Sequence, residues 1–440
     1  MLNEEEFDED GKVRGGDGVV YNWKTLAKGG GLTIIGNGFS INGLHYSGET
    51  YGNVALFTNV VLNEIIDLVF ENIYINASGY ATLFWYCKTI VGLTVRSGFL
   101  SAKKAGITTF CWNADRVINY AQIKAVTNLF GLCGGVVENG VVKNCINYAN
   151  LMTGTSGAVF VYEAKKGCKI ENCINYGNLS GSANVGGIVY VGDSIVIDCC
   201  KNYGDIVAET YQSAGVVVLP RGNIIIKNCE SYGVVESNSD DNCGMILGAL
   251  ATSSYLVDKT ILLQNIKVVK TAKERNRFNG LMGSQYAACK VIAENIEIVF
   301  EGNCALRTNT EGIICYSCLD LEIRNVYIRA NISQTDKQIN LIYYNRGNFV
   351  IKNVLIEGYF PTVNICKVKL EEATKTIDSI ILNHKNQSGT RFYYGKNFDS
   401  FFSNWKTGEI KLKKFSVKSF YQGEVTEEFL LGKGFVKKDI

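Results

Sequence analysis

The pentapeptide NCINY occurs twice in this chain, first from Asn144 and again 28 residues later from Asn172. A looser pattern around its first asparagine, hydrophobic-x-Asn-hydrophobic-x-hydrophobic, recurs through most of the 440 residues. The copies that carry the asparagine are marked by Asn42, Asn72, Asn119, Asn144, Asn172, Asn228, Asn265, Asn295, Asn325 and Asn353. Gly92 and Cys199 take its place in two further copies, and successive marks lie 20 to 37 residues apart. Repeats of this length cannot bury their hydrophobic faces alone, so they must stack on their neighbours.

The sequence of each repeat predicts short strands joined by turns. Apolar residues alternate with a period of two, as in VFENIYI, and helical spacing is absent from these segments. Many copies also carry an earlier apolar strand led by glycine, such as GAVFVY and GGIVYV. Three short strands and three corners in about 25 to 30 residues describe one coil of a parallel β-helix. We therefore expect an all-β chain: a single-stranded right-handed parallel β-helix, or solenoid, of about 12 to 13 coils with terminal caps.

The repeated asparagine has a structural explanation. A corner between two strands leaves backbone groups unpaired, and asparagine tolerates the left-handed conformation that a corner needs. Its amide carries donors and acceptors, so stacked asparagines can bond to each other and to the backbone. The pattern predicts a structural asparagine ladder, with Asn172 buried and its amide paired. Ligand binding by these asparagines is the alternative.

Two stretches resemble a known family. GGGLTIIGNGFSINGL with the later IIDLVFENIYI resembles the opening coils of GLUG-type right-handed β-helix proteins, which are common on bacterial surfaces, and NCINYGNLSGSANVGGIVYVG is similar to their central repeats. Similar coils also build phage tail spikes and polysaccharide lyases. The resemblance covers about residues 29–383 and implies a fold more strongly than a function. Residues 1–28 are expected to cap the first coil, and residues 384–440 to form a C-terminal cap or a small appended β element that covers the last edge.

Composition excludes several classes of protein. A net charge of +2 without a basic stripe argues against nucleic-acid binding. The chain has no apolar run long enough for a membrane helix, so we expect no membrane insertion. The acidic N-terminus lacks the basic and apolar regions of a secretory signal. An extracellular, cell-surface or virion location is still favoured, because the resembling proteins are found there.

Candidates for catalysis and metal binding are few. His45 and His384 are the only histidines, lie many coils apart and are expected to be ordinary surface residues, so neither forms a catalytic pair. Cys315 and Cys318 form a CYSC pair without a second pair, which favours strand packing over a zinc site. Asp240 and Asp241 are the only adjacent aspartates. They are a weak catalytic dyad or, as we prefer, part of a solvated loop. We expect no catalytic residue, metal or cofactor.

Two side-chain columns follow the asparagine mark. Cys145, Cys173, Cys200 and Cys229 come one residue after it and are expected to point inward, as packed thiols or, since stacked coils lie within disulfide range, as disulfides. Four positions after the mark stand Tyr148, Tyr176, Tyr203 and Tyr232. Their rings either stabilise the rod alone or form an exposed aromatic ladder whose faces bind sugars.

These features favour a non-enzymatic, surface-displayed or virion-associated adhesin-like protein that binds glycan or another surface polymer. The four tyrosines are its candidate ligand-binding residues. A polysaccharide-acting lyase or glycoside hydrolase is one alternative, and a purely structural spacer is another. Self-association is compatible with each, as a trimer if the chain builds a spike.

Overall fold

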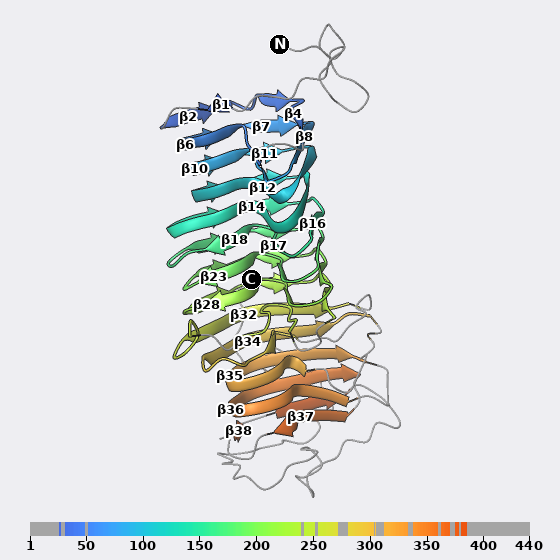
Figure 1. The fold of residues 1–440 in the computed structure, drawn as a ribbon. Helices are drawn as coiled ribbons and strands as arrows, with labels where there is room; N and C mark the ends of the chain where they lie inside the picture. The colour runs from blue at the N-terminus through green and yellow to red at the C-terminus, as the bar shows by residue number, and fades with distance from the viewer. Residues whose placement is uncertain are drawn as a thin grey trace, which may run out of the picture. The chain divides into compact units, whose positions relative to one another are not determined.

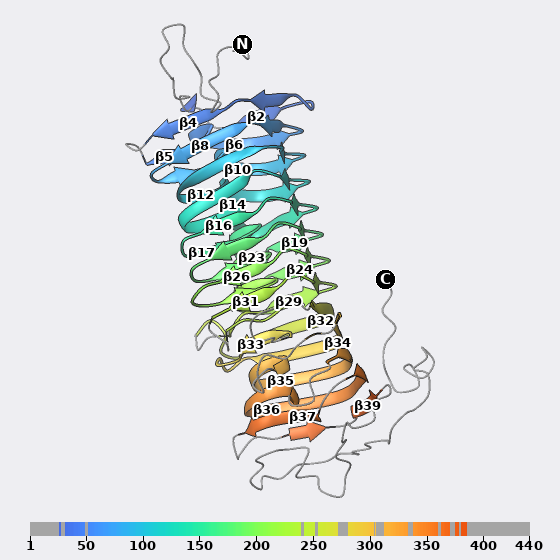
Figure 2. The ribbon, with the colours of Figure 1, turned by 90° about the vertical axis from the view of Figure 1, so that its right-hand side faces the viewer.

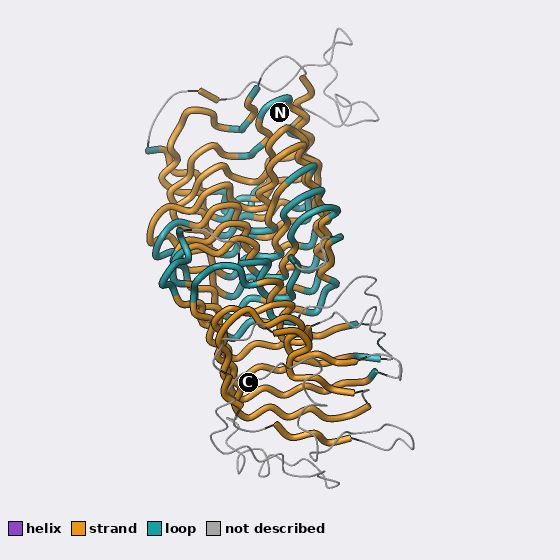
Figure 3. The backbone as a smooth tube through the Cα atoms, turned by 60° about the horizontal axis from the view of Figure 1, so that its bottom comes forward, coloured by secondary structure: helices purple, strands orange, loops and turns teal. Residues whose placement is uncertain are grey.

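The chain folds as an all-β parallel solenoid. The computed structural model describes residues 26–27, 31–48, 52–238, 242–250, 254–271, 280–302, 304, 312–332, 338–359, 362–369, 375–377 and 380–384. These residues form strands and loops without a helix, drawn in orange and teal in Figure 3. The parallel strands stack in about ten turns, somewhat fewer than the sequence suggested. The two expected caps lie almost wholly outside the described residues, as do Asp240 and Asp241.

The chain divides into two compact units, which we describe separately. Unit 1 comprises Met1–Ile195 and Asn202–Glu209, and unit 2 comprises Val196–Lys201 and Thr210–Ile440. The strands of unit 1 are β1 (Leu26–Ala27), β2 (Leu32–Ile35), β3 (Ser40–Asn42), β4 (His45–Gly48), β5 (Asn53–Val54), β6 (Phe57–Ile66), β7 (Val69–Glu71), β8 (Ile73–Ala77), β9 (Tyr80–Ala81), β10 (Phe84–Val91), β11 (Thr94–Val95), β12 (Gly98–Asp115), β13 (Ile118–Asn119), β14 (Gln122–Lys143), β15 (Ile146–Asn147), β16 (Leu151–Thr153), β17 (Ser156–Ala158), β18 (Val161–Ala164), β19 (Lys169–Glu171), β20 (Ile174–Asn175), β21 (Leu179–Gly181), β22 (Val185–Gly186), β23 (Val189–Asp193) and β26 (Ile206–Ala208).

Strand β25 (Lys201–Asn202) falls at the boundary between the units. The strands of unit 2 are β24 (Val196–Asp198), β27 (Ser213–Ala214), β28 (Val217–Arg221), β29 (Ile224–Lys227), β30 (Glu230–Ser231), β31 (Val235–Ser237), β32 (Thr260–Lys270), β33 (Met282–Ser284), β34 (Lys290–Phe300), β35 (Gly312–Asn331), β36 (Gln338–Tyr359), β37 (Thr362–Lys369), β38 (Lys375–Ile377) and β39 (Ile380–His384).

In unit 1 the core is a set of columns along the stack. Strands β6, β10, β12, β14 and β19 lie side by side in parallel register, and Figure 1 shows the first four in chain order. One column runs through Ile65, Ile90, Ala114, Val142 and Ile170, each at most 1% exposed. Because like residues meet at the same place in every coil, an apolar position repeated in the sequence becomes a continuous apolar core.

In unit 2 the corner asparagine explains the pattern of burial along a strand. In β34 the inward residues are Val291 and Ala293 before the corner, and Ile296 and Ile298 after it. The alternation shifts by one residue at Asn295, whose φ of 56° is left-handed. A left-handed residue turns the chain and restarts the period of two, and this produces the motif x-Asn-hydrophobic-x-hydrophobic. Strands β32, β34 and β35 repeat the arrangement in register.

The structure confirms an asparagine ladder but divides the ten asparagines among four positions. Seven are left-handed corner residues, with φ between 53° and 56°: Asn144, Asn172, Asn228, Asn265, Asn295, Asn325 and Asn353. Gly92 and Cys199 are also left-handed, as the repeat pattern suggested. Asn72 is left-handed at another corner, five residues after Asp67, which aligns with Gly92.

Asn42 and Asn119 are not left-handed corner residues. Asn42 is the last residue of β3 and pairs with Glu71, so the left-handed residue there is Gly43. Asn119 aligns with Asn147, three residues after the corner at Asn144. The sequence pattern failed here because asparagine also occurs directly before a corner, at Asn42, and at a buried inward position, Asn119, and both have apolar neighbours similar to those of the corner asparagines.

Candidate binding surface: an exposed tyrosine ladder and a groove

Four tyrosines of unit 1 occupy one register on its outer surface. Tyr120, Tyr148, Tyr176 and Tyr203 are 46%, 43%, 45% and 38% exposed. Each follows a two-residue β segment, and β13, β15 and β20 lie in parallel register. The backbone N–H groups of Tyr148 and Tyr176 donate to the carbonyls of Asn119 and Asn147, both at 2.8 Å. Backbone pairing between coils therefore fixes the height of each tyrosine.

The tyrosine rings stack face to face. Ring centroids are 4.7 Å apart for Tyr120 and Tyr148, 5.1 Å for Tyr148 and Tyr176, and 5.1 Å for Tyr176 and Tyr203. The corresponding ring planes differ by only 4°, 7° and 6°. A neighbour at this distance on both sides leaves no room for a sugar against the faces of Tyr148 or Tyr176. The ladder therefore presents ring edges and hydroxyl groups to solvent, not the open faces that we expected.

A buried asparagine ladder supports the tyrosines from inside. Asn119, Asn147, Asn175 and Asn202 each directly precede one of the tyrosines and are at most 4% exposed. Their Nδ2 groups donate to the Oδ1 of the next asparagine at 2.9, 2.9 and 2.8 Å. Each Nδ2 also donates to the carbonyl two residues ahead, as Asn175 does to Gly177 at 2.8 Å. Both N–H groups of Asn119, Asn147 and Asn175 are thus used, and Asn202 donates to the carbonyl of Gly204 at 2.8 Å, so these bonds fix the turns that carry the tyrosines.

Beside the ladder lies an open groove of about 620 Å³. Its polar lining residues are Gln122, Lys124, Asn150, Asn178, Ser180 and Asp205, and buried Leu151 and Leu179 contribute apolar surface. Gln122, Asn150, Asn178 and Asp205 each stand two residues after a ladder tyrosine. A buried alanine or glycine separates them, so both positions face outward. Residues of β14 and β16 line the groove, and both strands are labelled in Figure 2.

The structure brings together three of the four predicted tyrosines. Tyr148, Tyr176 and Tyr203 lie in the ladder. Tyr232 belongs to unit 2, where it is half-buried and its hydroxyl donates to Glu230. The fourth ladder member, Tyr120, was missed because Asn119 was aligned with Asn144. The shared triplet INY in RVINYAQI and NCINY is the sequence signal that identifies it.

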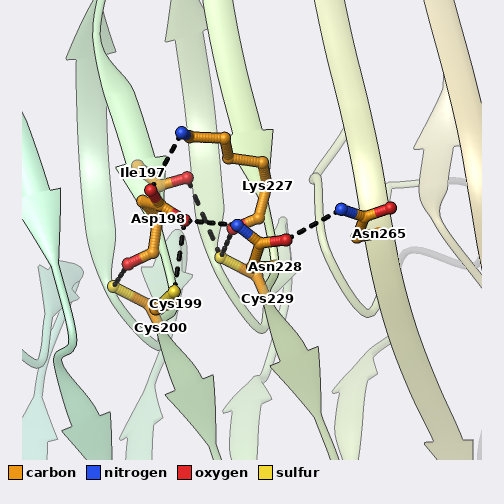
Figure 4. Close-up of polar contacts among 8 residues, drawn as sticks. All are labelled: Ile197, Asp198, Cys199, Cys200, Lys227, Asn228, Cys229 and Asn265. Carbon is orange, nitrogen blue, oxygen red and sulfur yellow. Dashed lines mark hydrogen bonds and ion pairs between the residues drawn. The ribbon is translucent and has the colours of Figure 1, made fainter. Parts of the chain in front are cut away.

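The corner asparagines make their own ladder in unit 2. Asn228, Asn265, Asn295, Asn325 and Asn353 each donate from Nδ2 to the preceding coil, at 2.8 to 3.1 Å. The series ends at Asp198, which accepts from Asn228 and pairs with Lys227 at 3.0 Å (Figure 4). Partial burial opposes ionisation of Asp198, but hydrogen bonds from Asn228, Lys227 and Cys199 outweigh it and lower the pKa of this carboxyl. An aspartate one residue before the corner thus replaces the missing asparagine.

The corresponding corner in unit 1 is more exposed than predicted. Asn144 donates to Asp115 at 2.8 Å, and Asn172 donates to Asn144 at 3.3 Å. Asn172 is paired, as expected, but it is exposed rather than buried. The corner side chain lies along the outer edge of the turn, while the next residue, Cys173, points into the core.

The cysteines of the described residues are thiols and not disulfides, and nearly all are buried. Cys145 and Cys173 in unit 1, and Cys200 and Cys229 in unit 2, point inward as predicted. A second group lies elsewhere in unit 1, where the Sγ atoms of Cys111 and Cys133 are 3.1 Å apart. The hydrogen bond to Cys133 and burial raise the pKa of Cys111. Neutral thiols are weak nucleophiles and weak metal ligands, so these cysteines act as small core residues.

The described candidates among the remaining histidines and cysteines, His45, Cys315 and Cys318, lie in the core. His45 is 2% exposed and stacks on Tyr74 with centroids 4.9 Å apart, so its expected surface position was wrong. His384 ends β39, and its side chain is not described. Cys315 and Cys318 are buried strand residues. Within the described ranges, no group of three or more histidine, cysteine, aspartate or glutamate residues could hold a metal ion.

Comparisons with known proteins found no relative: no family model matches the chain, and neither a curated protein nor a solved structure matches it. The part of the chain that the structure describes contains no helix long and apolar enough to span a bilayer.

Proposed function

We propose that this protein is a non-enzymatic, adhesin-like solenoid that binds a glycan or another surface polymer along one face of unit 1. The observation that carries the proposal is the exposed ladder of four tyrosines, repeated once per coil beside an open groove. A polymer repeats its chemical groups along its length. A surface that repeats at a fixed interval can engage several of them at once, and the linked contacts reinforce each other.

The tyrosine ladder exposes apolar ring surface to solvent, and a purely structural spacer would not need such exposure. Each of the four rings is more than a third exposed. Tyrosine is suited to recognition because it combines a large rigid ring with a polar tip. These exposed rings, gathered on one face, favour binding over the spacer alternative.

The groove argues against the enzyme alternative. Asp205 is the single carboxylate among its lining residues. Glycoside hydrolysis ordinarily needs two carboxyl groups, one on each side of the scissile bond. The resemblance to GLUG-type proteins, the cell-surface or virion location and self-association, including a spike-like trimer, belong to the same proposal and rest on the sequence.

A panel of polysaccharides tests the proposal when binding and the release of reducing ends are recorded together. We expect saturable binding to at least one polymer, weakened by Tyr176→Ala with Tyr203→Ala, and no chain shortening. Shortening of a bound polymer by the pure protein would support the enzyme alternative. If no polysaccharide of the panel binds, the result contradicts the proposal and favours the purely structural spacer.

A further inference from the structure

The amides of the groove have a fixed orientation. The Oδ1 of Asn150 accepts the backbone N–H of Asn178 at 2.9 Å, and the Oδ1 of Asn178 accepts the backbone N–H of Asp205 at 2.8 Å. Both side chains are exposed, and their Nδ2 groups have no hydrogen-bond partner among the described residues. The backbone therefore takes the acceptor end of each amide, and two N–H donors per residue are left for the groove.

The same surface carries further unpaired donors. The ammonium group of Lys124 and the amide of Gln122 line the groove, and neither pairs with another described residue. Both are exposed. The stacked tyrosines beside them turn their ring edges outward, and the edge of an aromatic ring is the positive part of its quadrupole. Amides, ammonium and ring edges together make a surface suited to negative charge.

Asp205 marks one end of this surface. It occupies in its coil the position that Asn150 and Asn178 occupy in theirs. A carboxylate there would repel an anionic ligand. The surface suited to an anionic ligand therefore spans three consecutive coils. The first carries Gln122 and Lys124, the second Asn150 and the third Asn178.

We infer that the polymer recognised here is an acidic polysaccharide, with carboxylate groups of successive sugars held by Asn150, Asn178 and Lys124. This inference rests on the proposed function and narrows it to one ligand class. Carboxylates accept several hydrogen bonds each, and bonds from amide or ammonium donors to an ionised acceptor are stronger than bonds between neutral groups. Stacking in register places the donors at the coil spacing of about 4.8 Å, so an extended chain lying along the groove can present one acidic group after another.

Single-stranded nucleic acid is a poorer fit to the same surface. Its bases bind by stacking on open aromatic faces, and the faces of Tyr148 and Tyr176 are covered by neighbouring rings. Backbone binding needs a basic groove, and Lys124 is the one basic residue among those that line this groove.

The test compares polymers that differ only in charge. Polygalacturonate, alginate and hyaluronan are each paired with their methyl esters, and binding to the full chain is measured at low and moderate salt. We expect at least one polyuronate to bind about tenfold more tightly than its ester, and added salt to weaken the binding.

The double variant Asn150→Asp with Asn178→Asp isolates the donors. Aspartate keeps a side-chain oxygen that can accept the backbone N–H, but it replaces both N–H donors with negative charge. We expect this variant to fold normally and to lose at least about tenfold in affinity for the polyuronate but not for its ester. Asn113→Asp is the matched control, because exposed Asn113 also accepts a backbone N–H, that of Val141 at 3.1 Å, outside the groove.

The possible results distinguish failure of the acidic-ligand inference from failure of the proposed polymer binding. Equal binding of polyuronates and esters, unchanged in the double variant, would overturn the acidic ligand and leave polymer binding intact. Tighter binding of a single-stranded oligonucleotide than of every polyuronate would also overturn it. If no polymer of either kind binds, the inference and the proposed function fail together.

Discussion

Asn147 and Asn175 join two coils through one hydrogen bond of 2.9 Å, in which the Nδ2 of Asn147 donates to the Oδ1 of Asn175. This bond runs toward the C-terminus. In the corner ladder of unit 2 the direction is reversed, because the Nδ2 of Asn265 donates back to Asn228 at 2.9 Å. The inner amides also donate to the carbonyl two residues ahead, which sets their direction. The two ladders therefore have different structural roles. The buried ladder of unit 1 stabilises the turns that carry the tyrosines, and the ladder of unit 2 links the corner residues of successive coils.

The inner ladder should contribute more to stability than the outer corner of unit 1. Asn175→Ala leaves the Nδ2 of Asn147 and the N–H of Gly177 without their acceptors in a fully buried place. We expect a loss of about 1–3 kcal/mol in the free energy of unfolding. Asn172→Ala, at the exposed corner, should cost less, and Asn172→Gly should be nearly neutral because glycine adopts the left-handed φ of 53°. Urea unfolding measures all three, and equal losses for Asn172→Ala and Asn175→Ala would refute this ranking.

Asp198 should make stability depend on pH in acid. Its pKa is lowered in the folded chain, so its contribution is fully present above the unfolded value of about 3.9 and is lost as pH falls through the folded pKa. Asp198→Asn removes the ion pair with Lys227. We expect the variant to melt lower than the parent near neutral pH and the two melting temperatures to converge below pH about 4. Glu209→Gln, at an exposed carboxylate without a described ion pair, is the control, and a constant difference between parent and Asp198→Asn at every pH would exclude this role.

Cys199 should be the first cysteine of the described residues to be alkylated in the native protein, because it alone among them is exposed. Its reaction should nevertheless be slow at pH about 8, since partial burial and the neighbouring Asp198 raise its pKa to about 11 and only the thiolate reacts. Raising the pH should accelerate labelling, and Asp198→Asn should do the same at constant pH. Mass spectrometry after timed alkylation locates the label. Earlier labelling of buried Cys111 or Cys133 would contradict the packing described for them.

The backbone pattern of this fold could be predicted from the sequence, but the alignment of its coils could not be predicted throughout. Left-handed corners select asparagine or glycine, so residues such as Asn295 and Gly92 reveal the coil period. Asn72 and Asn144 look alike in sequence because both turn a corner, although the corners differ. Position 119 is an asparagine because it belongs to the buried inner ladder, not because it turns a corner. Aligning Asn119 with the corner residue Asn144 therefore displaced the expected register of this coil by three residues.

The site was predicted in part for the same reason. Tyr148, Tyr176 and Tyr203 share one sequence context and were found together, whereas Tyr120 was hidden by the misaligned coil. The covered ring faces could not be foreseen, because they depend on the tilt of each ring against its neighbour. The groove depends on side chains from several coils, such as Lys124 and Asn178, and no single repeat contains its pattern.

The most direct test of the central claim, that the tyrosine ladder is part of a polymer-binding face, is the affinity of Tyr176→Ala with Tyr203→Ala for the best polysaccharide of the panel. Both rings are exposed, so the variant should keep its parallel β fold and most of its melting temperature. We predict that it binds at least about tenfold more weakly than the parent, a loss of about 1.4 kcal/mol. Tyr211→Ala, at a tyrosine that is 56% exposed and outside the ladder, should bind like the parent. Parental affinity in the double variant, with the fold intact, would contradict the claim.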